Sequence, residues 1–389
     1  AVAVLHSAGT LMTAHGINPI DGNYWLLSTE SLNAAHNSED KHRGVFAFAQ
    51  LAIANNVGVG TRPKPSTLID LDAPIGGGQK TVGSSMSFPY ALAFHNSGHA
   101  AIAASTSDLI TFVTQTGTRY ADVPIVQPAG MPTPIGRAIP RDLEWDQQRN
   151  LLYVYCWGWN KVLLFDGNNP ANAPFWFELG PDPLAVEVQE GRSIFYDAKR
   201  AQDNNTSGTP FHGAVTCSTC HPGGGMDLLG WGLSDSFADV KDLMVTQSLL
   251  SIGDTFPYHW RGERNLDHFN GAFKGLLGHQ SVLTASELEK FEAFVFSLQA
   301  PANPIQHIDR KLDGLPARGG QQAFLHTPNV LFGQTCADCH QMPSGTNGNR
   351  VAEIVLGIAS TATFDVSHLR QLTHKNQHRQ KWGKQEGKK

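Results

Sequence analysis

Residues 89–113 read PYALAFHNSGHAAIAASTSDLITFV. Three apolar runs in this stretch are separated by Asn96-Ser97-Gly98 and by Ser107-Asp108, which are residues that favour turns. Short apolar runs bounded by turn residues indicate β-strands joined by tight connections. The stretch therefore predicts three consecutive strands.

The same order recurs at residues 141–166, which read RDLEWDQQRNLLYVYCWGWNKVLLFD. Leu143 follows Leu92 by 51 residues. Repeats of about 40–50 residues that hold several short strands are typical of β-propeller blades. We expect a further copy of the repeat to begin at Pro183.

These repeats predict a β-propeller-like N-terminal domain over residues 1–185. Tyr24-Trp25 and the run Val45-Phe46-Ala47-Phe48 are assigned to earlier blades. A seven-bladed propeller of this period needs about 300 residues. The propeller is therefore expected to be small, to be incomplete, or to be completed by another subunit.

The second half of the sequence contains two copies of the pattern Cys-x-x-Cys-His, at residues 217–221 and 336–340. This spacing is the covalent attachment signature of a c-type haem. If the pattern opens a helix, both thiols lie on one face and can bond to the porphyrin, and the histidine can reach the iron. We therefore predict two c-type haems. The attaching residues are Cys217, Cys220, Cys336 and Cys339, and the proximal iron ligands are His221 and His340.

The cysteine spacing also bears on a zinc site and on redox disulfides. A zinc site built from two Cys-x-x-Cys pairs normally has the pairs about 15–20 residues apart, whereas Cys217 and Cys336 are 119 residues apart. A pair of redox disulfides would explain neither adjacent histidine. The fifth cysteine, Cys156, lies among apolar, strand-like residues, which favours a buried and inert thiol over a reactive or interchain one.

Composition limits the possible partners and location. The formal net charge of −5 argues against a nucleic-acid partner. No apolar run approaches the about 18 residues of a membrane-spanning helix, so we expect no transmembrane segment. The sequence starts at Ala1 without an initiator Met, which we interpret as a processed or trimmed start. Covalent haem attachment takes place after export, so the expected location is periplasmic or extracellular.

Each haem motif is preceded by a Gly-x-x-x-Phe pattern, at Gly191–Phe195 and at Gly320–Phe324. We interpret this as a duplicated cytochrome c unit, with mainly α-helical haem domains at residues 186–305 and 306–389, the second one short. Between the motifs, Thr284 and Glu287 form a capping-box pattern ahead of an apolar helix face that runs to Leu298.

The haem half of the chain resembles the di-haem cytochrome c peroxidase superfamily, in the branch where a propeller precedes two haem domains. The resemblance rests on both haem motifs and on the segments 191–197, 224–231, 259–264, 269–278 and 301–304. It implies one haem that moves electrons and a second that is the reactive site, with Trp260 as the candidate electron bridge. Members of this family can carry a calcium ion between the haem domains, but no ligands for it can be matched in this sequence, so calcium stays unassigned.

The sixth ligand of each iron decides whether a haem only transfers electrons or also admits a small molecule. For the first haem the candidate distal ligands are His259, His268 and Met226. For the second haem they are Met342, His368, His374 and His378. The chain ends soon after residues 367–372 in a basic tail at 381–389, so we expect the second haem to be exposed or covered by another chain.

Three functions follow from these features. The first is a di-haem cytochrome that moves electrons between its haems and a redox protein or another electron donor or acceptor. The second is a peroxidase-like enzyme that reduces hydrogen peroxide at one haem. The third is a haem-bearing subunit of a homo-oligomer or larger assembly. The sequence identifies no acid or base residue at a haem pocket, so catalytic residues remain unknown.

Overall fold

The structure is a computed structural model. It describes residues 9–33, 44, 46–55, 65–201, 213–233, 244–303, 309, 311–312, 314–329, 333–352, 363–370 and 372. The chain divides into two compact units. Unit 1 comprises Ala1–Thr246 and Asn270–Phe294, and unit 2 comprises Gln247–Phe269 and Val295–Lys389.

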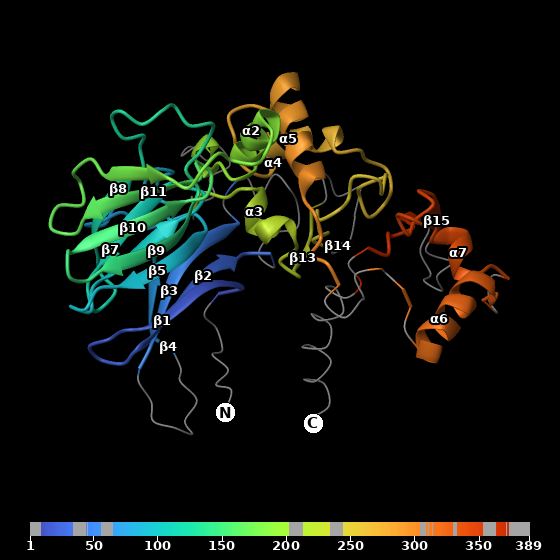
Figure 1. Cartoon of the computed structure of the whole chain (residues 1–389), viewed down its shortest axis with the longest axis horizontal. Coiled ribbons are helices and arrows are strands. Elements are labelled where there is room, and N and C mark those ends of the chain that lie inside the picture. The colour runs from blue at the N-terminus through green and yellow to red at the C-terminus, as the bar shows by residue number, and fades with distance from the viewer. Residues whose placement is uncertain are drawn as a thin grey trace. The chain divides into compact units, whose positions relative to one another are not determined.

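Unit 1 contains three four-stranded antiparallel sheets among its described residues, and each strand pairs with its neighbours in sequence (Figure 1). The first sheet consists of β1 (Leu11–Ile17), β2 (Tyr24–Ser31), β3 (Ala47–Ala54) and β4 (Pro65–Asp70). The second consists of β5 (Pro89–Phe94), β6 (Ala100–Ala104), β7 (Leu109–Val113) and β8 (Arg119–Pro124). The third consists of β9 (Pro140–Asp146), β10 (Leu151–Cys156), β11 (Lys161–Asp166) and β12 (Phe175–Glu178).

This arrangement of consecutive four-stranded sheets confirms the expected propeller-like domain. The three strands predicted from residues 89–113 are β5, β6 and β7, and those predicted from residues 141–166 are β9, β10 and β11. The earlier assignments are also confirmed, because Tyr24-Trp25 lie in β2 and Ala47-Phe48 lie in β3.

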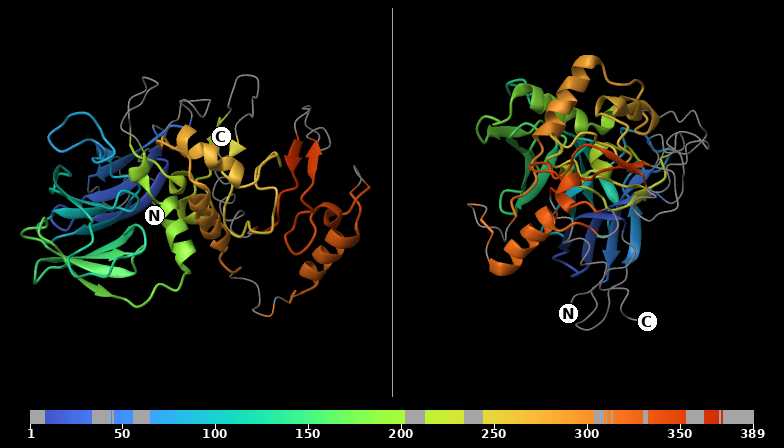
Figure 2. Two further views of the ribbon diagram at one scale, coloured as in Figure 1. Left: turned by 90° about the horizontal axis from the view of Figure 1, so that it is seen from above. Right: turned by 90° about the vertical axis from the view of Figure 1, so that its right-hand side faces the viewer.

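The core lies between successive sheets. One apolar cluster joins the first and second sheets, and a second cluster joins the second and third. In β6, Ile102 belongs to the first cluster while Ala101 and Ala103 belong to the second. A strand that is buried on both faces has apolar residues at every position. This explains why apolar and polar residues do not alternate along β6. Figure 2 shows the three sheets next to one another in chain order.

The prediction that a further strand repeat begins at Pro183 is wrong. A helix, α2 (Val186–Phe195), begins there instead of a strand. Its buried positions are Gly191, Arg192, Ile194 and Phe195, a spacing that places them on one helical face. The fourth strands β8 and β12 were not predicted, because both carry exposed and polar positions that resemble loops.

Besides the sheets and α2, the described parts of unit 1 include short elements and most of one long helix, whose last three residues are assigned to unit 2. The short elements are η1 (Ala198–Arg200), α3 (Cys217–Cys220), η2 (Pro222–Gly224), the strand pair β13 (Gly230–Trp231) and β14 (Met244–Val245), and α4 (Asn270–Gly275). The long helix α5 (Ala285–Ser297) confirms the predicted capping box. The Thr284 backbone N–H donates to Glu287 at 3.0 Å, and the Glu287 N–H donates to the Thr284 hydroxyl at 3.3 Å.

The described residues of unit 2 include η3 (Asp267–Phe269), α6 (Gly314–His326), α7 (Cys336–Cys339), β15 (Arg350–Ala352) and β16 (Thr363–Asp365). The division into haem domains at 186–305 and 306–389 remains a prediction, as does their mainly helical character. His374, His378 and the tail at 381–389 lie outside the described residues. In the part of the chain that is described, no helix is both long and apolar enough to cross a membrane.

Candidate functional site

The first Cys-x-x-Cys-His segment opens a short helix. Cys217–Cys220 form α3, and Thr216 is its N-cap residue. The Thr216 N–H donates to the Thr219 hydroxyl at 3.0 Å, and the Thr216 side chain in turn accepts from the helix backbone. Because this reciprocal cap starts the helix one residue before Cys217, both cysteines lie on one face, three residues apart.

The second segment has the same local structure. Cys336–Cys339 form α7, with Thr335 as the N-cap residue. Asp338 takes the place of Thr219, since its carboxylate accepts from the Thr335 N–H at 2.7 Å and from the Thr335 hydroxyl at 3.0 Å. Two segments with different capping side chains therefore place their two cysteines in the same arrangement on a short helix.

Both histidines are held in the same way by a backbone carbonyl. The Nδ1 atom of His221 lies 3.3 Å from the carbonyl oxygen of Gly225, and that of His340 lies 2.9 Å from the carbonyl oxygen of Gly345. A carbonyl oxygen only accepts, so Nδ1 carries the proton and the lone pair of the neutral ring is on Nε2. A histidine that ligates a metal through Nε2 commonly donates its other N–H in this way.

The donor set of each segment fits a covalently attached haem. All five cysteines are thiols without a disulfide partner. Each segment therefore offers two thiols on one helical face, followed by an imidazole whose Nε2 is the basic nitrogen. The described residues contain no group of three or more His, Cys, Asp or Glu side chains that could hold a metal ion by themselves.

The two segments differ in how deeply they are buried. Around the first, Thr216, Ser218 and Thr219 are buried, and burial raises the pKa of the Cys217 thiol to about 12. In the second, Cys336 is exposed, and no described residue of α6, the helix that precedes it, is buried. Cys217, Cys220 and Cys339 are all partly buried, so the difference between the segments lies at Cys336 and in the residues around each motif, which are more buried at the first segment.

The predicted distal ligands fall in both units. Met226 belongs to unit 1 and follows Gly225, the residue whose carbonyl faces His221. His259, His268 and Trp260 belong to unit 2, as do Met342, which is 75% exposed, and His368. His259 has a carboxylate partner, because its Nδ1 lies 2.6 Å from an oxygen of Glu263. Their assignment as ligands, and that of Trp260 as a bridge, remains a prediction.

One histidine that sequence reasoning missed lies buried in unit 1. His279 is 6% exposed, and its ring centroid is 5.5 Å from that of Phe273. Its Nε2 atom has no hydrogen-bond partner among the described residues. Burial lowers the pKa of His279 to about 4, so the ring is neutral near pH 7. The only sequence signal was its place directly after the segment 269–278.

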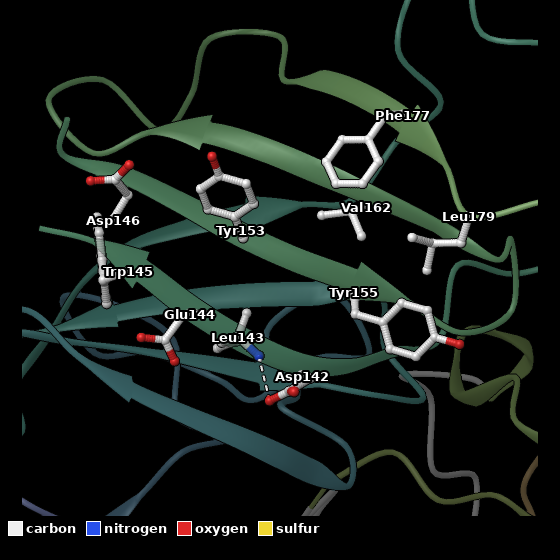
Figure 3. Close-up of a pocket in the computed structure, with 10 residues that line it drawn as sticks. All are labelled: Asp142, Leu143, Glu144, Trp145, Asp146, Tyr153, Tyr155, Val162, Phe177 and Leu179. Atoms are coloured by element: carbon white, nitrogen blue, oxygen red, sulfur yellow. Dashed lines mark hydrogen bonds between the residues drawn. The ribbon is translucent and has the colours of Figure 1, made fainter.

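A separate pocket of about 440 Å³ lies on the third sheet (Figure 3). Acidic Asp142, Glu144 and Asp146 of β9 lie beside aromatic Tyr153 and Tyr155 of β10. None of the predicted haem-site residues lines it.

Comparisons with known proteins identify no family for this chain. No protein-family model matches the sequence, and no curated protein matches it. Among solved structures, a Kuenenia stuttgartiensis hydrazine synthase pressurized with xenon is 18% identical with a TM-score of 0.34, covering 61% of this chain and 69% of that one. U3-55K is 11% identical with a TM-score of 0.30, covering 47% of this chain and 43% of that one.

A virginiamycin B lyase from Staphylococcus aureus is 14% identical with a TM-score of 0.25, covering 44% of this chain and 42% of that one. The chain thus spans less than half the length of U3-55K and of this lyase. Overlap at this level assigns neither a family nor an activity.

Proposed function

We propose that this protein is a di-haem c-type cytochrome that moves electrons between two covalently bound haems and a redox partner. The observation that carries the proposal is the local structure shared by the two Cys-x-x-Cys-His segments. Each is a capped four-residue helix followed by a histidine whose Nδ1 faces a backbone carbonyl. This local geometry recurs in two segments that share little sequence beyond the motif itself.

Each protein group has a defined part in this proposal. Cys217 and Cys220 would hold one haem through thioether bonds, and Cys336 and Cys339 would hold the other. His221 and His340 would supply the proximal nitrogen, and the carbonyls of Gly225 and Gly345 would orient each ring and strengthen its basicity. The bound haem supplies one-electron redox chemistry, which no side chain of this set supplies by itself.

The unequal burial of the two segments supports unequal roles. A haem at the more buried first segment would exchange electrons mainly within the protein. A haem at the more exposed second segment would be the point where electrons enter or leave, since solvent exposure brings a partner closer. Exposure also changes the reduction potential of a haem, so the two haems should differ in potential.

The location and the domain organisation follow from the same proposal. Covalent attachment places the protein in the periplasm or outside the cell. The propeller-like domain would then precede two haem domains, as in the di-haem cytochrome c peroxidase superfamily.

The test is to produce the protein in a host that attaches c-type haem and to measure its intact mass. The expected mass gain is that of two haems. Replacing Cys217 and Cys220 by Ala, or Cys336 and Cys339 by Ala, should each remove one haem and leave the other. A protein that carries no covalent haem would overturn the proposal.

Spectroscopy separates electron transfer from peroxidase chemistry. Two low-spin haems that do not respond to hydrogen peroxide would support electron transfer alone. A high-spin haem that reacts with peroxide would favour the peroxidase-like alternative, because an open sixth position admits a small molecule.

A further inference from the structure

The chain directly ahead of the first haem segment is buried within unit 1. Ala214 is 5% exposed, Val215 is 0% exposed and Thr216 is 2% exposed. The backbone of Ala214 is held on both sides by serines of the propeller-like domain. Its N–H donates to the Ser85 hydroxyl at 2.8 Å, and its carbonyl accepts from the Ser87 hydroxyl at 2.6 Å. The segment that leads into Cys217 is therefore fixed three residues before the first attachment site.

The bond to Ser85 continues to a buried carboxylate. The Ser85 hydroxyl donates to Asp72 at 2.7 Å. Because a hydroxyl has one proton, this bond fixes the oxygen of Ser85 as the acceptor for the Ala214 N–H. Asp72 is 1% exposed, and it also accepts from the N–H of Met86 at 2.9 Å and that of Ala49 at 2.6 Å. Asp72 thus ties Ser85 to β3 of the first sheet.

The bond to Ser87 continues into the second sheet. The Thr106 hydroxyl lies 2.7 Å from the Ser87 hydroxyl, and Thr106 is the second residue after the end of β6. The Thr106 carbonyl accepts from the N–H of Ala198 at 3.0 Å. Ser87 and Thr106 are 3% and 0% exposed, so water does not compete for these bonds.

Gly213 shows how closely the segment approaches Asp72. A Cβ atom at Gly213 would overlap the Asp72 carboxylate, so only glycine lets the backbone lie there. This contact and the two serine bonds come from one continuous stretch of four residues that ends at the cap of α3.

We propose that Asp72 and Ser85 are positioning residues for the first haem, acting through Ala214 on the start of α3. The inference rests on the proposed attachment of haem at Cys217 and Cys220. Neither residue touches the haem ligand. Instead, they hold the backbone whose next turn carries both thiols and His221. Groups that hydrogen-bond a metal ligand directly set its orientation and tune the metal. Asp72 and Ser85 would act one step further out, by fixing the backbone that leads to His221.

The test compares two buried serines in the holoprotein. Ser85→Ala removes the acceptor of the Ala214 N–H. Ser105→Ala is the matched control, because Ser105 is equally buried and donates to the Pro140 carbonyl at 2.5 Å within the propeller-like domain. The electron paramagnetic resonance spectrum of each haem is recorded, with signals assigned from the two paired-cysteine variants. The second haem serves as the internal reference.

Ser85→Ala is expected to shift and broaden the signal of the first haem and to leave that of the second unchanged. Ser105→Ala is expected to change neither, although both variants should lose thermal stability. If Ser85→Ala fails to fold, Ser85→Cys replaces it, because a thiol fills nearly the same space but accepts a hydrogen bond from the Ala214 N–H only weakly. An unchanged first-haem signal in the folded variant, or an equal shift in Ser105→Ala, would overturn the inference. A wild-type protein without a first-haem signal would instead refute the proposed function.

Discussion

Arg200 and Glu287 form an ion pair in which the guanidinium nitrogen and the carboxylate oxygen are 2.8 Å apart. Arg200 also lies 3.5 Å from Asp197, which lies 3.4 Å from Arg137. Arg137 in turn pairs with Asp108 at 2.8 Å. A chain of alternating charges therefore runs within unit 1 from the turn between β6 and β7 to the first turn of α5. It ties the propeller-like domain to the helix predicted between the haem motifs.

Replacing Glu287 by Ala should lower the free energy of unfolding by about 1–2 kcal/mol. About 1 kcal/mol comes from the lost helix cap, and up to about 1 kcal/mol comes from the partly exposed ion pair. Glu289 is an exposed carboxylate on the same helix, so Glu289→Ala is the control and should change stability by less than about 0.5 kcal/mol. Denaturant unfolding measures both. Equal losses in the two variants would show that Glu287 contributes no specific contact.

Gly191 should be intolerant of any side chain. A Cβ atom at this position of α2 would overlap the Lys290 carbonyl and the Phe294 side chain of α5. Gly191→Ala should therefore destabilise unit 1 by about 1–3 kcal/mol through overpacking.

Gly271 of α4 is the matched control for Gly191, because a Cβ atom there meets nothing within 4 Å. Gly271→Ala should raise stability by about 0.4–1 kcal/mol, since alanine loses less backbone freedom in a helix. Thermal unfolding of the two variants should thus shift in opposite directions. A shift in the same direction would contradict the close packing of α2 on α5.

The sequence was most informative where local pattern alone decides the structure. Strands β5 to β7 and β9 to β11 were predictable because apolar runs and turn residues alternate at short range. Helix α5 was predictable from its capping box and its apolar face. The short helices at the two Cys-x-x-Cys-His segments were expected from the motif spacing, and haem attachment there stays a prediction.

Other features depend on contacts between distant residues. Arg192 is buried in α2, where it pairs with Asp182 at 2.6 Å. Because a charged residue occupies a buried position, the buried face of this helix could not be recognised from the sequence. His279 is buried against Phe273, and nothing local signals that burial. Likewise, Asp72 and Ala214 are brought together through Ser85 by tertiary structure alone.

His279 should make stability fall in mild acid. Burial lowers its pKa from 6.5 to about 4, so the unfolded chain binds the proton more readily than the folded chain does. The stabilisation is therefore complete above pH 6.5 and is lost as the pH falls toward about 4. The difference is on the order of 3 kcal/mol. Unfolding of wild type and His279→Leu across this range should show a steeper acid loss for wild type, and parallel curves would contradict the prediction.

Asp365 should have the opposite effect in unit 2. Burial raises its pKa from 3.8 to about 7, and its Oδ1 atom has no hydrogen-bond partner in the described part of the chain. The contribution of the protonated carboxyl to stability is fully present below pH 3.8 and is lost as the pH rises through about 7. Asp365→Asn cannot ionise, so its melting temperature relative to wild type should rise between a pH of about 4 and a pH of about 8. A constant difference would show that Asp365 does not titrate in this range.

Cys156 is the one cysteine outside the two Cys-x-x-Cys-His motifs, so the number of free thiols in the denatured protein reports how many haems are attached. It is 0% exposed in β10, and burial raises its pKa well above the ordinary value, so it should not react with a thiol reagent in the native protein. After denaturation, a protein with two attached haems should label at one thiol, because the other four sulfurs are thioethers. Cys156→Ala should then label at none. Labelling at five sites would mean that neither haem is attached, and labelling at three would mean that one motif is empty.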